Sequence, residues 1–294
     1  MALVSLQTIL HHARRHGYAV GYFEAWDLYS LEAALGAAEA LRAPAILGFG
    51  GAVTDAGWQE RHGIEALSAP ATCLAARAAV PAAVLYNEAQ EFAHAVRGLR
   101  AGCNAVMLDS SHLPAAEHAA LTARLAEVAH ALGAAVEAEL GHLPNAADPS
   151  HVGRLTDPAE AARFVAATGI DALGVAIGNV HILEHGEATV DLDLLGRIHA
   201  ATDVPLVIHG GTGFPRAAIP AAIRLGVAKF NVGTTLKHAF RDGMRAALGR
   251  DEGIHEQMGS RTDADVLESG KRRMQQRIVG LAELYGSAGR ADTF

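Results

Sequence analysis

The sequence predicts a (β/α)8 barrel in a single domain, and two observations favour this fold class. Short apolar segments alternate with longer helical patterns from end to end of the 294 residues. Most of the short segments are continuously apolar, as expected for parallel strands that helices cover on both faces. Eight strand–helix units in about 250 residues are typical of this barrel. A doubly wound open sheet would be favoured by a glycine fingerprint after the first strand, which this sequence does not have.

Apolar runs and helix-end signals define the expected elements. Several helical segments end in glycine, and the segment at 157–169 opens with Asp157 and Pro158, a typical helix start. The expected strands cover residues 18–25, 44–50, 82–89, 104–111, 134–141, 171–178, 205–211 and 227–234. The expected helices cover residues 30–42, 87–102, 114–133, 157–169, 191–201 and 215–226. A long C-terminal helix is expected at 263–286, outside the barrel, and residues 1–294 are expected to form one domain because no linker divides them.

Composition and charge restrict the class of function. Half of the residues are apolar and 19% are charged, so the chain can bury a large core. The formal net charge of -8 disfavours nucleic-acid binding, which needs a basic face. No apolar run approaches the roughly 18 residues of a membrane span, and the N-terminal segment has no signal-peptide pattern. We therefore expect a cytoplasmic protein. Cys73 and Cys103 lie among apolar residues and are expected to be buried thiols.

Polar side chains follow nearly every expected strand. In a barrel of this kind the active site lies at the carboxyl ends of the strands. The residues expected there are Glu24, Asp27, Asn87, Glu88, Asp109, Ser111, Glu137, Glu139, Asn179, His181 and His209. Glu137 and Glu139 share one face of the fifth strand because side chains alternate with period two. Two inward carboxylates destabilise a fold unless they meet a cation or hydrogen-bond donors.

His181 and His209 follow neighbouring strands, so their imidazoles could converge at the carboxyl end of the barrel. Taken singly, each would be read as a surface or capping histidine in a chain that has 16 of them. A carboxylate from Glu88, Glu139 or Asp109 would complete a metal site of two histidines and one carboxylate, with an open position for substrate.

Small residues follow the seventh and eighth strands, in the sequences HGGTG (209–213) and NVGT (231–234). Backbone N–H groups in such segments can approach an anion, and this part of the barrel is its usual phosphate site. Either segment alone would be explained as a tight turn. Together they favour a phosphate site.

These residues resemble the class II, metal-dependent fructose-bisphosphate/tagatose-bisphosphate aldolase family. The resemblance covers essentially the whole chain, with motifs in the family's order: GYAV, VMLDSSHLP, VEAELG, LTDP, VAIGNVHI, VPLVIHGGTGFP, FNVGTTLK and YGSAGRA. It implies a barrel enzyme that is a homodimer or homotetramer, binds one catalytic zinc and often uses a monovalent cation. Its substrate carries a dihydroxyacetone-phosphate-like group, and its metal stabilises the enediolate formed when the carbon–carbon bond breaks.

The resemblance also implies roles for individual residues. It places zinc ligands at His181 and His209, the strand-five glutamate at Glu139, and an aspartate linked with a second metal position at Asp109. The phosphate-binding backbone that it implies comprises Gly210, Gly211, Thr212, Asn231, Val232, Gly233 and Thr234.

The chain departs from the family pattern at positions 87 and 88, where Asn87 and Glu88 replace Asp-His. In the family the Asp moves a proton on the substrate hydroxyl whose carbon becomes the aldehyde, and the His is the third zinc ligand. Asn87 cannot accept that proton. Glu88 can still bind a metal, and its anionic oxygen would shift the preference from zinc toward manganese or iron. At the first strand, Glu24 replaces the family's asparagine, and the loop expected at 142–155 has Asp148 as its only internal acid.

Three interpretations stay open. In the first, Glu88 is the third metal ligand and the protein is an aldolase for a different phosphorylated ketose or keto-acid sugar. Asn87 then orients a substrate hydroxyl, while Glu139 and Asp148 serve the chemistry and His142, His151 or Arg154 of the loop contacts the substrate. In the second, Glu88 is a base and the metal keeps two histidines and Glu139. In the third, catalysis is lost and the barrel binds phosphosugars. A conventional fructose- or tagatose-bisphosphate aldolase is a further alternative, if another group supplies the missing proton chemistry.

Overall fold

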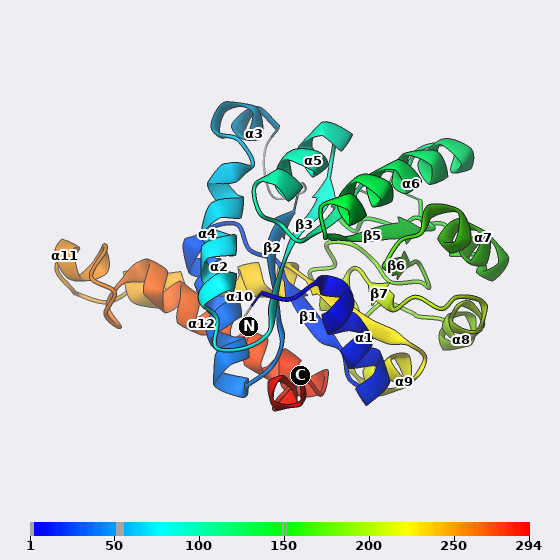
Figure 1. Cartoon of the computed structure of the whole chain (residues 1–294). Coiled ribbons are helices and arrows are strands. Elements are labelled where there is room, and N and C mark those ends of the chain that lie inside the picture. Colours follow the sequence, from blue (N-terminus) through cyan, green and yellow to red (C-terminus); the bar gives the residue numbers. More distant parts are fainter. Residues whose placement is uncertain (1–2, 51–55, 149, 151) are drawn as a thin grey trace.

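The structure, a computed structural model, confirms the expected barrel, and it describes residues 3–50, 56–148, 150 and 152–294. Eight parallel strands pair in chain order, and the last pairs with the first to close the sheet (Figure 1). The strands are β1 (Val20–Phe23), β2 (Ala45–Gly50), β3 (Ala82–Ala89), β4 (Ala105–Leu108), β5 (Ala135–Leu140), β6 (Ala172–Val175), β7 (Leu206–Ile208) and β8 (Val227–Val232). Nearly all of their residues are buried, which explains their continuously apolar sequences.

Helices connect the strands and cover the outside of the barrel (Figure 1). They are α1 (Leu6–His16), α2 (Leu28–Leu41), α3 (Ala56–His62), α4 (Glu65–Arg77), α5 (Phe92–Arg100), α6 (Ala115–Ala131), α7 (Pro158–Thr168), α8 (Leu192–Ala201), α9 (Ile219–Arg224), α10 (Thr234–Leu248), α11 (Ile254–Gln257) and α12 (Val266–Leu284). The sequence signals of α7 are confirmed, because the Asp157 carboxylate accepts a hydrogen bond from the Glu160 N–H and Gly169 ends the helix at φ 65°. Among these described helices, none combines the length and the apolar character of a membrane span.

Helix α1 closes the amino-terminal end of the barrel. Its residues Leu6, Ile9 and Leu10 are fully buried and pack in one cluster with the interior of the strands. The strands contribute small side chains to this cluster, including Ala83 and Ala135, and the alanines leave the volume that the larger residues of α1 fill. The polar groups of the barrel therefore open at its other end, where the strands finish.

Helices α10 and α12 pack against each other beside α2. Helix α12 is the C-terminal helix expected at 263–286, whereas no helix was expected where α10 lies. Asp265 caps α12 by accepting hydrogen bonds from the N–H groups of Leu267 and Glu268. Helix α11, coloured orange in Figure 1, lies at the end of an arm that projects away from the barrel. Its residue Ile254 and the adjoining Met258 are exposed.

Three expectations from the sequence were wrong in detail. The helix expected from residue 87 begins only at Phe92, because β3 continues to Ala89. The residues between β2 and β3, for which no helix was expected, contain α3 and α4. Cys103 is buried as expected, but Cys73 is exposed on α4, so only one of the two thiols belongs to the core.

Candidate active site

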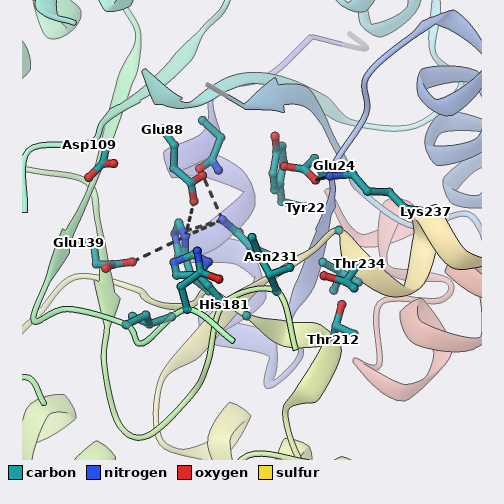
Figure 2. A pocket seen from close by; sticks show the side chains of 18 of the residues that line it. Tyr22, Glu24, Glu88, Asp109, Glu139, His181, Thr212, Asn231, Thr234 and Lys237 are labelled. Atoms are coloured by element: carbon teal, nitrogen blue, oxygen red, sulfur yellow. Dashed lines mark hydrogen bonds and ion pairs between the residues drawn. The ribbon is translucent and has the colours of Figure 1, made fainter. Parts of the chain in front are cut away.

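A pocket of about 680 Å³ opens where the strands end (Figure 2). It brings together most of the residues that the sequence singles out. Those that line it are Glu24, Asn87, Glu88, Asp109, Ser111, Glu139, His142, His181, His209, Gly210, Thr212, Asn231, Val232, Gly233 and Thr234. Gly211 is buried behind the turn and does not line the pocket, and neither does Asp148. The carboxyl end of the barrel is therefore the candidate active site.

Asn87 and Glu88 both reach the pocket because β3 bulges at this point. Tyr86 pairs with Val106 of β4 and Ala89 pairs with Leu108, so β3 has one residue more than β4 in this interval. Regular alternation would send residues 87 and 88 to opposite faces of the strand. The bulge, together with a φ of 52° at Glu88, turns the second side chain inward as well. Positive φ is strained for glutamate and is seen at functional sites more than elsewhere.

Glu88, His181 and His209 converge where the sequence suggests a metal site. One ligand atom from each residue lies within 4.8 Å of the other two. The His209 Nδ1 atom is 3.1 Å from Glu88 Oε1, and the two imidazole rings are 5.9 Å apart between centroids. Two imidazoles and one carboxylate that converge on an open pocket fit a divalent metal such as zinc, manganese or iron.

The Glu88 side chain is held in its anionic form. Burial alone would raise the pKa of this carboxyl, but the hydrogen bond to His209 and the nearby His181 and Asn87 lower it to about 2. The neighbouring His209 is affected in the opposite direction. Burial alone would lower its pKa, but hydrogen bonds to Glu137 and Glu88 raise it to about 10. The carboxylate is thus available as a ligand, and it points at the imidazole nitrogen on the pocket side.

A buried network behind His209 fixes the orientation of its ring. The His209 Nε2 atom donates to Glu137 Oε1 at 2.9 Å. The Lys229 ammonium donates to both oxygens of Glu137, at 2.9 and 2.8 Å, and to Asn231 Oδ1 at 2.6 Å. Lys229 and Glu137 are both 0% exposed. Because Nε2 is engaged with this carboxylate, Nδ1 is the nitrogen that is left for a metal.

Lys229 is the functional residue that sequence reasoning missed. The expectation that inward carboxylates meet a cation or donors is confirmed for Glu137, but its partner was not identified. One signal was available, since Lys229 interrupts the apolar run of β8 and lies two residues before Asn231. Residues two apart on a strand share a face. The lysine therefore had to point inward with the asparagine.

Glu139 and Asp109 both line the pocket, on the side away from Thr212 and Thr234 (Figure 2). Glu139 Oε2 is 3.8 Å from His209 Nδ1. Burial raises the pKa of the Glu139 carboxyl to about 7 against the opposing charge of His209, and the carboxylates of Glu88, Asp109 and Glu137 add to the rise. A concentration of carboxylates that raises a pKa in this way is typical of a functional site.

The turns after β7 and β8 lie side by side, as a phosphate site requires. Gly210 has a φ of 70° and leads into a 3₁₀ turn at Gly211–Gly213. The Thr212 hydroxyl accepts a hydrogen bond from the Thr235 N–H at 3.3 Å, which joins the two turns. Helix α10 begins at Thr234, and because its N-cap residue Gly233 has no side chain, the Thr212 hydroxyl caps it instead. The positive end of the α10 dipole would attract an anion.

The two ends of the loop at 142–155 are joined beside the site, and residues 146–148 in its middle are exposed. His142 and Arg154 exchange two backbone hydrogen bonds, of 2.8 and 2.7 Å, and the His181 N–H donates to Pro144 O at 2.9 Å. Asp148 is exposed, and its carboxylate accepts hydrogen bonds from Ser150. His142 lines the pocket, the Arg154 guanidinium pairs with Glu160 at 2.8 Å, and His151 lies outside the described residues.

Comparisons with known proteins show the family of this chain. The family model described as fructose-bisphosphate aldolase class-II matches residues 4–290. A fructose-bisphosphate aldolase of Geobacillus stearothermophilus is 33% identical over 295 aligned positions, which cover 99% of each chain.

Solved structures give the same result. The crystal structure of the YdjI aldolase from Escherichia coli K12 superimposes with a TM-score of 0.82 at 29% identity, over 98% of this chain and 99% of the other. A fructose-bisphosphate aldolase from Campylobacter jejuni shares the fold, with a TM-score of 0.79 at 22% identity over 98% and 97% of the two chains. This chain therefore belongs to the class-II fructose-bisphosphate aldolase family and is an aldolase, a metal-dependent carbon–carbon lyase.

Proposed function

We propose that this aldolase cleaves a phosphorylated ketose or keto-acid sugar, and forms it in the reverse direction, with a divalent metal held by Glu88, His181 and His209. The observation that carries this proposal is the convergence of these three side chains to within 4.8 Å of one another. Zinc is the expected metal, and the carboxylate ligand makes manganese or iron the alternatives.

Different groups of the pocket bind the ketone, the phosphate and a hydroxyl of the substrate. A divalent ion at this position supplies a Lewis acid for the ketone of the substrate. The phosphate is held by the backbone of the two turns, Gly210–Thr212 after β7 and Asn231–Thr234 after β8. The Asn87 Oδ1 atom accepts a 3.5 Å hydrogen bond from Asn231 Nδ2, and the Asn87 amide also donates to Glu88, so one amide N–H is left to orient a substrate hydroxyl.

The other interpretations of Glu88 receive less support. A carboxylate whose pKa is lowered to about 2 is a weak proton acceptor at neutral pH, which argues against Glu88 as the base. A barrel that only binds phosphosugars would not need a strained Glu88 or the buried charges of Lys229 and Glu137. Such features are costly to a fold unless they serve a site.

Two finer features belong to the same proposal. The carboxylates of Asp109 and Glu139 would bind a monovalent cation or a second metal, since oxygen ligands suit hard cations. The chain would form a homodimer or homotetramer through the projecting arm, because Ile254 and Met258 expose apolar surface there that a second copy can cover.

Dihydroxyacetone phosphate offers a direct test of this function. With metal added, the protein is expected to exchange a carbon-bound proton of dihydroxyacetone phosphate with solvent deuterium, because enolisation is the half-reaction that needs no aldehyde. Proton NMR in D2O with zinc, manganese or iron measures the exchange. The same assay on Asp148→Asn tests the loop acid as the base. Because the Asp148 carboxylate is exposed and does not line the pocket, we expect near-parental exchange, and a large loss would assign the role to Asp148. Parent protein that shows no exchange with any of these metals would favour a phosphosugar-binding protein.

A further inference from the structure

The proposed function so far assigns no group to move the proton of the acceptor hydroxyl. Aldol cleavage turns the carbon that bears this hydroxyl into an aldehyde, so the hydroxyl proton must leave. Asn87, which orients the hydroxyl in the proposed function, has an amide that neither gains nor loses a proton at neutral pH. Another pocket side chain must therefore accept the proton in cleavage and return it in condensation.

Glu24 lies within reach of the space that Asn87 faces. Its backbone N–H donates to Val232 O of β8 at 3.0 Å, which fixes the end of β1 against the phosphate turn. Its carboxylate lines the pocket between Tyr22 and Lys237 (Figure 2). A Cβ atom built on Gly50 would lie 3.3 Å from Glu24 Oε1 and 3.8 Å from Asn87 Nδ2, so both groups border one small volume beside β2.

The surroundings of Glu24 suit a proton-transfer group. Its side chain is 13% exposed, and one oxygen is 3.0 Å from the Lys237 ammonium. Burial raises the pKa of the Glu24 carboxyl, an effect that Lys237 opposes and the charge of Glu88 reinforces. A raised pKa brings a carboxyl closer to the neutral range in which acid–base catalysis is most effective.

The hydroxyl of Tyr22 is a second, independent sign that a ligand belongs here. Tyr22 is 1% exposed and lines the same pocket, yet its hydroxyl has no hydrogen-bond partner among the described residues. Buried hydroxyl groups nearly always have a partner. A hydroxylated substrate beside Glu24 would provide one.

We propose that Glu24 is the acid–base residue of the acceptor half of this aldolase, taking the role that Asn87 cannot perform. In cleavage, the Glu24 carboxylate accepts the hydroxyl proton, the carbon–oxygen bond becomes the carbonyl of the aldehyde, and the electron pair of the broken carbon–carbon bond passes to the ketone half. In condensation, protonated Glu24 returns the proton to the oxygen of the aldehyde as the new carbon–carbon bond forms. This inference rests on the proposed function, because it needs the aldol reaction.

The experiment compares two half-reactions in Glu24→Gln, a variant of the same shape. One is deuterium exchange into dihydroxyacetone phosphate, and the other is condensation of dihydroxyacetone phosphate with glycolaldehyde, D-glyceraldehyde or L-glyceraldehyde. We expect the variant to keep its metal content and to exchange at the parental rate. We expect its kcat for condensation to fall by roughly 10²–10⁴-fold, the usual contribution of a general acid–base group.

Two further variants separate catalysis from a structural role. If Glu24 only pairs with Lys237, then Lys237→Met should lower kcat as Glu24→Gln does. We expect Lys237→Met instead to raise the KM for dihydroxyacetone phosphate, because it removes a cation beside the phosphate turns. The double variant Glu24→Gln/Asn87→Asp should recover condensation activity, since it returns a carboxylate to the same small volume.

The outcomes distinguish this inference from the proposed function. Glu24 is supported as the acid–base residue if Glu24→Gln loses condensation but keeps deuterium exchange, and if the double variant Glu24→Gln/Asn87→Asp recovers condensation. Unchanged condensation in Glu24→Gln overturns it, as does equal loss in both half-reactions. A parent protein that exchanges but condenses none of the three aldehydes also overturns it. A parent protein with no exchange overturns the proposed function itself.

Discussion

Replacing Glu88 by alanine is expected to strip the protein of tightly bound metal and to abolish the aldol reaction. Parent protein purified without added metal should hold about one divalent ion per chain, and the variant much less than one. The affinity should fall by more than the roughly 10–100-fold that loss of an outer-shell partner costs, because Glu88 is the anionic member of a group of three ligands. Metal analysis and competition with a chromogenic chelator measure the change.

A matched control comes from the same stretch of chain. Glu91 is an exposed carboxylate three residues further along, outside the pocket, so Glu91→Ala should leave the metal content unchanged. Glu88→His should retain metal and move the preference toward zinc, since imidazole is the softer ligand. If Glu88→Ala keeps its metal, the carboxylate belongs to substrate chemistry, and the metal site must be built from the two histidines and Glu139.

Replacing Lys229 by methionine is expected to destabilise the fold by about 3–5 kcal/mol, the cost of breaking a fully buried ion pair from one side. The Glu137 carboxylate would lose two hydrogen bonds from the ammonium, and Asn231 would lose a third. The His209 ring would also lose its fixed support, so metal affinity should fall by roughly 10–100-fold. Denaturant unfolding of the metal-free protein and a chelator competition measure the two effects separately.

Adding Glu137→Gln to Lys229→Met tests whether the unpaired Glu137 charge causes the loss of stability. It removes the uncompensated charge, so Lys229→Met/Glu137→Gln should be more stable than Lys229→Met alone. Arg97→Met, which breaks the exposed pair with Glu65, should cost less than about 1 kcal/mol. A Lys229→Met protein with the stability of the Arg97 variant would show that the buried network contributes little.

The sequence predicted those features that follow from hydrophobic periodicity and from the positions of polar residues along the chain. Continuously apolar strands, glycine helix ends and polar strand ends led to the barrel and to a site of His181 and His209 with a carboxylate from Glu88, Glu139 or Asp109. The family resemblance then favoured Glu88. The path of the chain at Glu88 was not predictable, because a bulge and a positive φ leave no trace in hydrophobic periodicity. They depend on the tertiary fit between β3 and β4.

The partners of the polar residues were also beyond the sequence. Lys229 binds Glu137, which lies 92 residues earlier in the chain. Glu24, directly after β1, forms an ion pair with Lys237 of α10. Such pairs are fixed by closure of the barrel, which brings distant strands together. Asp148 illustrates the reverse case, since its place in the loop suggested a catalytic acid, while its carboxylate is exposed and bonded to Ser150.

Anomalous diffraction from crystals loaded with manganese or zinc tests the central claim most directly. We expect one strong peak in the pocket, roughly 2.0–2.2 Å from a Glu88 oxygen and from one nitrogen of each of the two imidazoles, with His209 binding through Nδ1. A strong peak that lies between Asp109 and Glu139 with Glu88 beyond bonding distance would contradict the account, and so would the absence of any peak in the pocket.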